Sequence, residues 1–416
     1  MHSDPLVTPR LLATKEDPSF HGHFRTWGQM PAGGPLLVAE AEQAGLRGRG
    51  GAWFSTARKL ATVSAGRRPV VVANGTEGEP VSRKDKTLMA SAPHLVLDGV
   101  SVAADTLGAA EAIVCVDRCD TQSIKVLTRA LSERGSIKAD DVSIRLETAP
   151  TKYVTGEESA LVHWLNGGDA KPTFVPPRPF ERGVGGRPTL VNNVETLANL
   201  ALVARFGSAW FRALGTPDDP GTALITVVGD VTRDGVYEVP FGTSVEAILS
   251  SAGAASSVHA ILAGGFAGTW VPAGTAADLT FDRASFASVG AAIGCSSMVV
   301  LAEGSCGLAA TAQIARWLAA QSAGQCGPCI NGLPAIAGAL EGLVAGDRRR
   351  RWQQQLTQWL DMVEGRGACR HPDGTARMVR SALATFAEEI ENHRRYGACR
   401  AEAPSVPVPR MDGPWI

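Results

Sequence analysis

Hydrophobic and polar positions alternate in blocks over the first third of the chain. Short β-branched runs bounded by turn residues predict buried strands, and the longer stretches between them carry apolar residues at helical spacing. Strands separated by helices of this length predict a parallel sheet with crossover helices. The predicted strands are residues 69–74, 111–116 and 142–148, and the predicted helices are residues 35–45, 94–108 and 123–134.

The pattern changes after residue 150. Residues 150–220 are rich in loops and include a proline-dense stretch, which is followed by a predicted helix at 193–206. A small module with two strands and a helix comes next, and from residue 304 the apolar spacing is mostly helical. The predicted module elements are 222–228, 236–239 and 244–251, and the predicted C-terminal helices are 306–320, 332–345, 348–364 and 374–394.

These blocks predict four parts of the chain. We expect an irregular N-terminal arm (1–34), an α/β domain (35–220), a small module (221–285) and a C-terminal helical domain (286–416). A length of 416 residues is sufficient for several domains with cores of their own.

Composition and charge narrow the possible functions. Hydrophobic residues make up 44% and charged residues 19%, as in ordinary globular proteins. Forty basic and 41 acidic side chains give a net charge of −1, which argues against nucleic acid or an anionic membrane as the main partner. No apolar run reaches the length of a membrane helix, and the first residues lack the apolar core of a signal peptide. We therefore expect a cytoplasmic protein that reaches the inner membrane only through a partner.

A glycine-rich loop follows the first predicted helix. Four glycines fall within residues 45–51, interleaved with two arginines, and Lys59 follows them. Glycines let backbone N–H groups approach an anion closely, and the cations add favourable charge. This pattern favours a phosphate cradle, although a flexible surface turn accounts for the loop alone equally well.

Three further polar segments adjoin apolar runs. The first follows a predicted strand of the parallel sheet, at the edge where such sheets bind ligands. Taken singly, all three are also typical of solvated turns or helix N-termini. The segments are residues 74–80 with Glu77 and Glu79, residues 152–158 with Tyr153, Glu157 and Glu158, and residues 192–196 with two adjacent asparagines.

Eight cysteines in a chain of this length do not form a disulfide scaffold. Cys326 and Cys329 form a Cys-x-x-Cys pair between glycine and proline, and Cys369 follows forty residues later. This spacing suits an iron–sulfur cluster or zinc, with three unrelated buried thiols as the alternative. The pattern gives Cys119 and Cys399 no particular role.

Taken in order, the five segments resemble the flavin-carrying F subunit of NADH–quinone oxidoreductase (respiratory complex I) and its relatives in bidirectional hydrogenases and formate dehydrogenases. The resemblance covers about residues 35–395. It implies a parallel-sheet FMN-binding domain, a small β-grasp-like (SLBB) module and a C-terminal helical bundle with an iron–sulfur site. The motifs are Arg-Gly-Arg-Gly-Gly-Ala, Asn-x-x-Glu-x-Glu-Pro, Tyr-x-x-Gly-Glu-Glu, Asn-Asn-Val-Glu-Thr, and Cys-x-x-Cys with a distant Cys-Arg-His-Pro.

The resemblance also implies a role for each matching position. Hydride would pass from NAD(P)H to FMN, and single electrons would leave through a [4Fe–4S] or [3Fe–4S] cluster. Glu79 and Glu158 would contact the nicotinamide nucleotide as catalytic residues, and Cys326, Cys329 and Cys369 would hold the cluster. The residues that would bind or line the FMN site are Gly48, Gly50, Gly51, Lys59, Asn74, Glu77, Tyr153, Glu157, Asn192, Asn193 and Thr196.

Several positions depart from the family pattern, mostly where the dinucleotide is expected. Trp53 replaces a glycine and either stacks on a cofactor ring or fills the nucleotide's space. Ala323 replaces the first cluster cysteine, which leaves three thiols, and Cys295 or Cys306 would substitute only if a loop folds back. Our hypothesis is that FMN binding is retained and NADH binding is weakened or altered. The other departures are Thr62 and Arg178 in place of stacking phenylalanines, Val175 in place of a lysine, and Thr76 in place of an aspartate.

Three functions follow from this pattern. The first is an NAD(P)H dehydrogenase, and Arg178 would then favour NADPH or a protein electron donor. The second is an NAD-independent electron carrier that docks ferredoxin or a membrane reductase. The third is a scaffold subunit without redox groups. A partner protein is expected in each case, because the chain lacks further cysteine-rich modules for a long electron path.

Overall fold

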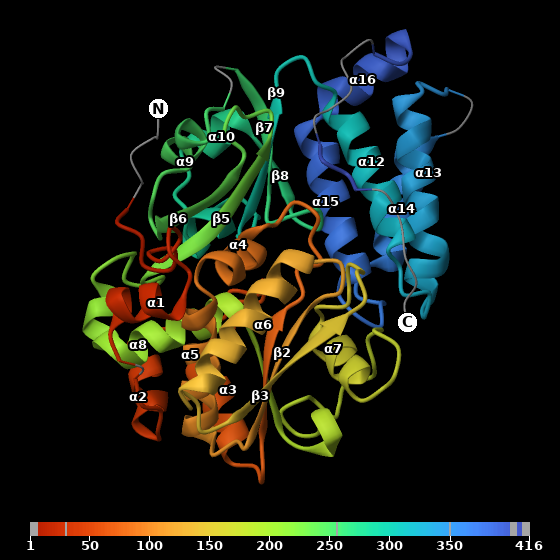
Figure 1. Ribbon diagram of the computed structural model, residues 1–416. Coiled ribbons are helices and arrows are strands. Elements are labelled where there is room, and N and C mark those ends of the chain that lie inside the picture. The colour runs from red at the N-terminus through yellow and green to blue at the C-terminus, as the bar shows by residue number, and fades with distance from the viewer. Residues whose placement is uncertain (1–6, 30, 255–256, 349–350, 400–405, 410–416) are drawn as a thin grey trace.

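A computed structural model describes residues 7–29, 31–254, 257–348, 351–399 and 406–409. Figure 1 shows a sheet flanked by helices, a second sheet next to it, and a group of long helices along one side of the molecule. The three regions follow one another along the chain, in the order that the hydrophobic pattern predicts.

The first sheet is parallel, with the strand order β3-β2-β1-β4. The inner strands β1 and β2 are nearly continuous buried apolar runs because helices cover both faces of a parallel sheet, whereas the edge strand β3 is mostly half-buried. Asn74 of β1 lies in register with Asn193 of β4, so the carboxyl ends of these two strands meet at one edge. The strands are β1 (Val70–Gly75), β2 (Glu111–Asp117), β3 (Ser143–Ala149) and β4 (Thr189–Asn193).

The helices of this domain pack closely against each other as well as on the sheet. A Cβ atom on Gly99 of α5 would lie 2.1 Å from the Leu197 carbonyl oxygen of α8, so only glycine allows this approach. The expectation of an irregular arm is wrong at α1, which Ser19 caps, and the region expected to be loops also contains α7 and β4. The helices are α1 (Phe20–Trp27), α2 (Leu36–Gln43), α3 (Thr56–Ser64), α4 (Lys84–Ser91), α5 (Pro93–Leu107), α6 (Thr121–Ser136), α7 (Glu158–Leu165) and α8 (Val194–Arg212).

The small module is built on a five-stranded sheet of order β6-β5-β9-β7-β8. Its central strand β9 pairs parallel with β5 and antiparallel with β7. This strand lies beyond residue 285, where we expected the module to end, and the division of the chain into domains remains a prediction. The elements are β5 (Thr222–Gly229), β6 (Gly235–Pro240), α9 (Val245–Ser251), β7 (Val258–Ala263), β8 (Thr269–Pro272), α10 (Ala273–Ala277), α11 (Arg283–Ser288) and β9 (Ser297–Ala302).

The C-terminal region is helical, as the apolar spacing predicts. The single helix expected at 374–394 is in fact two helices that meet at Phe386, whose buried ring packs against Trp270 of the module. No single helix in the described ranges is long and apolar enough to cross a membrane, although α4 and α5 together, bent by 95°, have a suitable length and composition. The helices are α12 (Gly307–Ala320), α13 (Leu333–Val344), α14 (Trp352–Val363), α15 (His371–Thr385) and α16 (Ala387–Tyr396).

Some of the predictions extend to residues that the structure does not describe. These are residues 1–6 and 30 of the predicted arm, 255–256 of the module, and 349–350, 400–405 and 410–416 of the C-terminal domain.

Candidate functional site

The glycine-rich loop lies against the start of α8, at the carboxyl edge of the parallel sheet. The backbone N–H of Arg49 donates to Thr196 Oγ1 at 2.8 Å, and a Cβ on Gly50 would lie 3.4 Å from Asn193 Cβ. Within the described part of the chain, no carbonyl or side chain accepts from the backbone N–H groups of Gly50 and Gly51. Two free N–H groups beside cationic residues form a favourable site for an anion.

Lys59 joins α3 to two other parts of the same edge. Its ammonium donates to the Val191 carbonyl oxygen of β4 at 3.0 Å and pairs with the Glu158 carboxylate at the start of α7. Both side chains are half-buried. The structure therefore brings together Lys59 and Glu158, which lie almost a hundred residues apart in the sequence.

Asn192 supplies a buried polar group without a protein partner. Its side chain is only 5% exposed, and its Nδ2 atom has no hydrogen-bond acceptor among the described residues. A buried amide that stays unpaired costs about 1–3 kcal/mol, so this group calls for a partner such as a ligand or an ordered water. FMN carries several acceptors, and the amide, the free glycine N–H groups and Lys59 together match its chemistry.

Asn74 and Glu77 hold the loop after β1 in place. The Asn74 amide donates to the Gly156 carbonyl oxygen at 2.9 Å, which ties this loop to residues 152–158. Glu77 accepts from the backbone N–H groups of Asp85 at 3.1 Å and Lys86 at 3.2 Å, so it caps α4. Burial, followed by the neighbouring Asp85, raises the pKa of Glu77. Both residues are therefore engaged in organising the edge.

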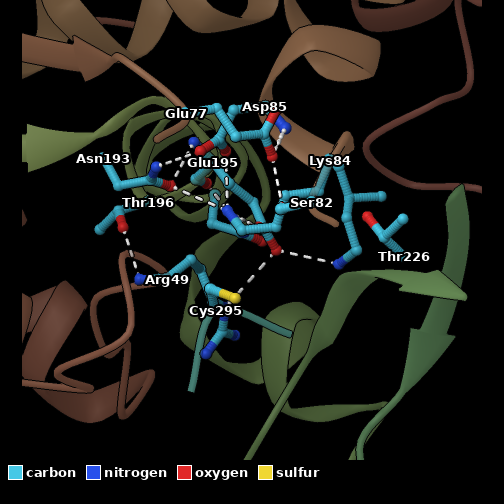
Figure 2. A network of polar contacts seen from close by, with 12 residues as sticks. Arg49, Glu77, Ser82, Lys84, Asp85, Asn193, Glu195, Thr196, Thr226 and Cys295 are labelled. Carbon is cyan, nitrogen blue, oxygen red and sulfur yellow. Dashed lines mark hydrogen bonds and ion pairs between the residues drawn. The ribbon is translucent and has the colours of Figure 1, made fainter. Parts of the chain in front are cut away.

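A buried ion network, drawn in Figure 2, joins Arg49 of the glycine-rich loop to residues at the starts of α4 and α8. Lys84 Nζ donates to Asp85 at 2.7 Å and to Glu195 at 2.8 Å. The other oxygen of Glu195, a fully buried residue, accepts from Leu224 N of β5 at 3.0 Å and lies 3.9 Å from the Arg49 guanidinium. Burial lowers the pKa of Arg49 to about 10, which leaves it cationic at neutral pH. One carboxylate thus links the glycine loop, α4 and the module.

Asn193 is the most fully bonded of the predicted cofactor residues. Its side chain caps α8 by accepting from Glu195 N at 3.0 Å, and its amide donates to Asp85 Oδ2 at 2.7 Å. In the same way Glu157 caps α7, accepting from Ser159 N and Ala160 N at 3.0 Å each. The sequence patterns at both positions are therefore helix N-caps, and the predicted cofactor contacts of Asn193 and Glu157 remain predictions.

Glu79 and Tyr153 lie where the three regions of the molecule meet. Glu79 accepts from Phe266 N of the module at 3.1 Å and from the Tyr153 hydroxyl at 3.3 Å. The Tyr153 ring packs against Trp317 and His371 of the helical region, with centroids 5.5 and 5.3 Å away. Burial raises the pKa of Glu79 to about 7, so this carboxyl group gains or loses its proton near neutral pH.

The three predicted cluster cysteines lie close together near the ends of α12 and α15. Cys329 N donates to the Cys326 carbonyl oxygen at 3.1 Å in the turn that joins the pair. Burial raises the pKa of the Cys329 thiol to about 12, and Cys326 and Cys369 add to the effect while the Ser322 hydroxyl opposes it. Cys295 instead bonds Gly264 and Ser297, and Cys306 lies beside Glu389 and His393. Neither provides the fourth thiol, so the residues present fit three of the four corners of a [4Fe–4S] cluster.

Trp53 makes its contacts with the protein, and both interpretations of this residue remain predictions. The indole is only 8% exposed, its N–H donates to the Gly294 carbonyl oxygen at 3.0 Å, and it packs edge-on against Phe241 of the module. These contacts anchor the glycine loop to the module. By contrast, Thr62 on α3 is exposed, and its hydroxyl donates to the Arg58 carbonyl oxygen at 2.7 Å. Arg178 is also exposed, in the proline-rich segment.

A cavity of about 670 Å³ opens beside the glycine loop. Gly51, Trp53 and Phe54 form part of its wall, and Phe54 is 50% exposed. Arg47 and Arg58 also line it, and neither has a carboxylate partner within 4.0 Å in the described ranges. The cavity therefore combines an accessible aromatic ring with two arginines that form no ion pair in the described part of the chain, and Glu42 contributes one carboxylate to its wall.

Two groups of residues in this arrangement were not predicted. Arg49 and Glu195 occur in the predicted motifs and Lys84 lies four residues after one of them, but sequence spacing does not show that one carboxylate serves both cations. The cluster of Cys306, His393 and Cys399 was missed because its members are far apart in the sequence.

Comparison with known proteins gives the family. Residues 41–202 match the Nuo51 FMN-binding domain, and residues 309–393 match the NADH-ubiquinone oxidoreductase-F iron-sulfur binding region. The F subunit 2 of the NADH-quinone oxidoreductase of Rhizobium meliloti (strain 1021) is 31% identical over 378 residues, which cover 87% of this chain and 90% of the relative. The chain belongs to the family of NADH–quinone oxidoreductase F subunits.

Another relative from this family and one solved structure extend the comparison. The F subunit of the NADH-quinone oxidoreductase of Mycobacterium bovis (strain ATCC BAA-935 / AF2122/97) is 29% identical, with 87% of this chain and 85% of the relative covered. The crystal structure of an air-oxidized NAD+-reducing [NiFe]-hydrogenase superposes with a TM-score of 0.83 at 31% identity, covering 92% of this chain and 66% of that one. This chain therefore spans about two thirds of the hydrogenase chain. The predicted family and fold class are confirmed.

Proposed function

We propose that this F-subunit relative takes electrons from a nicotinamide dinucleotide into FMN and passes them through an iron–sulfur cluster to a partner protein. Bound FMN supplies the conversion between two-electron and one-electron transfer. The observation that carries the proposal is the cradle itself, in which the Asn192 amide, two free glycine N–H groups and the Lys59 ammonium converge on one edge of the sheet. A scaffold subunit has no need of such groups.

Residues around the cradle take distinct parts in this proposal. The backbone N–H groups of Gly50 and Gly51 and the ammonium of Lys59 bind the phosphate, and Asn192 donates to an acceptor of the flavin. The Gly48 N–H donates to the Phe54 carbonyl oxygen at 2.8 Å and so shapes the loop. Asn74, Asn193 and Thr196 hold the surrounding loops in register, with Asn193 and Thr196 supported by the buried ion network. The scaffold is thus organised before the cofactor arrives, which lowers the cost of binding.

Tyr153 connects the flavin edge to the cluster region. It donates to Glu79 on one side, and its ring contacts His371, two residues after Cys369, on the other. Burial raises the pKa of the Cys369 thiol, and the carboxylate of Glu157, four residues after Tyr153, adds to this effect. We place the path of the electrons through this packed contact, with Cys326, Cys329 and Cys369 as cluster ligands.

The arginine-lined cavity beside the glycine loop is where we propose that the donor binds. NADH and NADPH carry a diphosphate, which Arg47 and Arg58 would neutralise, and the exposed Phe54 ring offers a surface on which adenine can stack. NADH is the simpler assignment, because the relatives are named for it. Glu79 and Glu158 would then orient the nicotinamide end of the dinucleotide.

The electron acceptor is a protein. The relatives are named as subunits of multi-subunit oxidoreductases, and the described part of this chain offers one cysteine cluster with iron–sulfur spacing. We propose a ferredoxin or a membrane reductase subunit as the partner, which would also bring the protein to the inner membrane.

An anaerobic absorbance titration of the FMN-loaded protein tests the proposal. Stoichiometric NADH should bleach the flavin band, and NADPH should do so less readily. Asn192→Ala should weaken FMN binding about twofold to tenfold, equivalent to the roughly 0.5–1.5 kcal/mol of a hydrogen bond between neutral groups. Asn166→Ala is the matched control, because both amide atoms of Asn166 are bonded to the protein near residues 183–185.

The rival functions predict different results from the same titration. A flavin that stays oxidised with both nucleotides but is reduced by ferredoxin would show an NAD-independent carrier. A colourless protein that takes up neither FMN nor iron would show a scaffold.

A further inference from the structure

A second cluster of potential metal ligands lies at the opposite end of α12 from Cys326. Cys306 is the N-cap of α12, immediately after the module, and its Sγ accepts from Ala309 N at 3.3 Å. His393 projects from α16, which sits at the end of the helical region in Figure 1. Cys399 follows the end of that helix. The ligand atoms of these three residues all lie within 4.8 Å of one another.

The spacing of these atoms matches a tetrahedral metal centre. Cys306 Sγ lies 3.5 Å from His393 Nε2 and 3.3 Å from Glu389 Oε2. In a tetrahedral zinc site with Zn–S near 2.3 Å and Zn–N near 2.0 Å, the sulfur and nitrogen ligands are about 3.5 Å apart. Glu389 precedes His393 by one helical turn, so both face the same sulfur.

The histidine is held in the tautomer that a metal requires. His393 Nδ1 is 2.7 Å from the Val344 carbonyl oxygen, which can only accept a hydrogen bond. Nδ1 therefore carries the proton, and the lone pair of Nε2 points to Cys306. A backbone carbonyl that orients the ring through its other nitrogen is the usual support of a metal-bound histidine.

We propose that Cys306, Glu389, His393 and Cys399 form a zinc site, separate from the proposed iron–sulfur site. Two thiolates, one imidazole and one carboxylate suit Zn²⁺ in tetrahedral geometry. Binding would release the protons of the two thiols to solvent. The site would tie the segment after α16 to the start of α12, and Glu389 would extend it to His259 of β7, which lies 2.8 Å away. Its role is therefore to fix the C-terminal helices against the module.

Zinc content and zinc coordination in the cluster-loaded protein test this assignment. We expect one zinc per chain, and X-ray absorption at the zinc edge should show two sulfur and two nitrogen or oxygen ligands. Competition with a chromophoric chelator should show that Cys399→Ser weakens zinc binding at least about a hundredfold. Cys119→Ser, which removes an exposed thiol of the flavin domain, is the control and should leave zinc binding unchanged.

The Cys399→Ser variant separates a loss of zinc binding from a loss of folding. Cys399 is exposed and lies beyond the last helix, so its substitution leaves the fold intact even if the buried His393→Ala variant does not fold. Equal zinc affinity in the Cys399→Ser variant and the control would overturn the proposal. Absence of zinc together with a Cys306–Cys399 disulfide in non-reducing mass spectra would also overturn it, and would show that the pair is a covalent link.

Discussion

Two sites differ in how many of the groups that each one needs are supplied by the protein. They are the flavin edge, where the glycine-rich loop meets the carboxyl ends of β1 and β4, and the group of Cys326, Cys329 and Cys369, here called the cysteine pocket. At the flavin edge, Glu195 balances Lys84 and Arg49, and most polar side chains have protein partners, so the unpaired Asn192 amide stands out. In the cysteine pocket, Ala323 stands where the family pattern has a cysteine, and three thiols remain.

This difference indicates which parts of an electron-transfer subunit can vary. The flavin edge is built into the interface between the first domain and the module, so its ion network is part of the fold as well as of the site. The cysteine pocket lies on turns at the ends of helices. Cys329 is part of the core there, but Ala323 is only half-buried, so this one position can change with little effect on the core. The predictions below test this contrast from the strongest expected effect to the weakest.

Glu195→Ala should cause the largest loss. It leaves the Lys84 ammonium and the Arg49 guanidinium buried without their shared counter-charge, which typically costs about 3–5 kcal/mol. Urea unfolding of the FMN-free protein measures the effect. Glu341→Ala is the control, because the Glu341–Arg316 pair is exposed and worth about 0–1 kcal/mol. Equal losses in the two variants would refute a structural role for the network.

Ala323→Cys should make the iron–sulfur cluster bound by the cysteine pocket more stable. A fourth thiolate would complete the ligand set, and we expect the cluster to survive in air about tenfold to a hundredfold longer, the range that ligand support is worth in metal affinity. The decay of visible absorbance measures the lifetime, and Ala320→Cys adds a thiol at the exposed end of α12 as the control. An unchanged lifetime would mean that another group already fills the fourth corner, and Ser322→Ala would then shorten it.

The pattern of apolar residues predicted the elements with long, regular signals. The three first strands, α5 and α6 are confirmed to within about two residues at each end. The pattern missed β4, because five residues after a proline-rich loop carry too few positions to show a period. It also missed β7, β8 and β9, since their register depends on pairing across distant segments.

At the site, the sequence located the motifs but not the partners of their side chains. The carboxyl-edge position of Asn74 follows from a parallel sheet, and the structure bears this out. Whether a polar side chain is used by the protein or left for a ligand is a question of tertiary contacts. Glu77 caps a helix and Asn192 has an unpaired amide, yet both stand in equally polar motifs.

Glu79 should make the FMN midpoint potential depend on pH near neutrality. Its pKa is raised to about 7, so the carboxyl group is neutral below this pH and anionic above it. A negative charge at the flavin edge opposes electron uptake by FMN. We therefore expect the FMN midpoint potential to fall more steeply as the pH rises through about 7 than it would without this carboxylate. The extra fall corresponds to a charge interaction of about 1 kcal/mol. Spectroelectrochemistry between pH 6 and pH 8 measures the slope. Glu79→Gln should remove the additional fall, and an identical slope in the variant would place Glu79 outside electrostatic range of the flavin.

Thr62→Phe should produce the smallest change, and it tests why the donor site departs from the family. Thr62 is exposed on α3, one turn after the cavity-lining Arg58, so an aromatic ring there could stack on the donor's adenine. We expect about 0.5 kcal/mol of added binding free energy, which calorimetry should record as an about twofold lower Kd for NADH. This value is at the low end of the range for aromatic pairs because the position is exposed. Thr128→Phe is a close control, since Thr128 is also exposed on a helix and makes the same bond to the carbonyl four residues earlier.

A gain confined to Thr62→Phe would mean that the dinucleotide lies along α3 and that its weakened binding comes from a missing ring. A tight Kd for NADH in the unmodified protein would contradict weakened binding altogether, and the arginines of the cavity would then suffice for the donor.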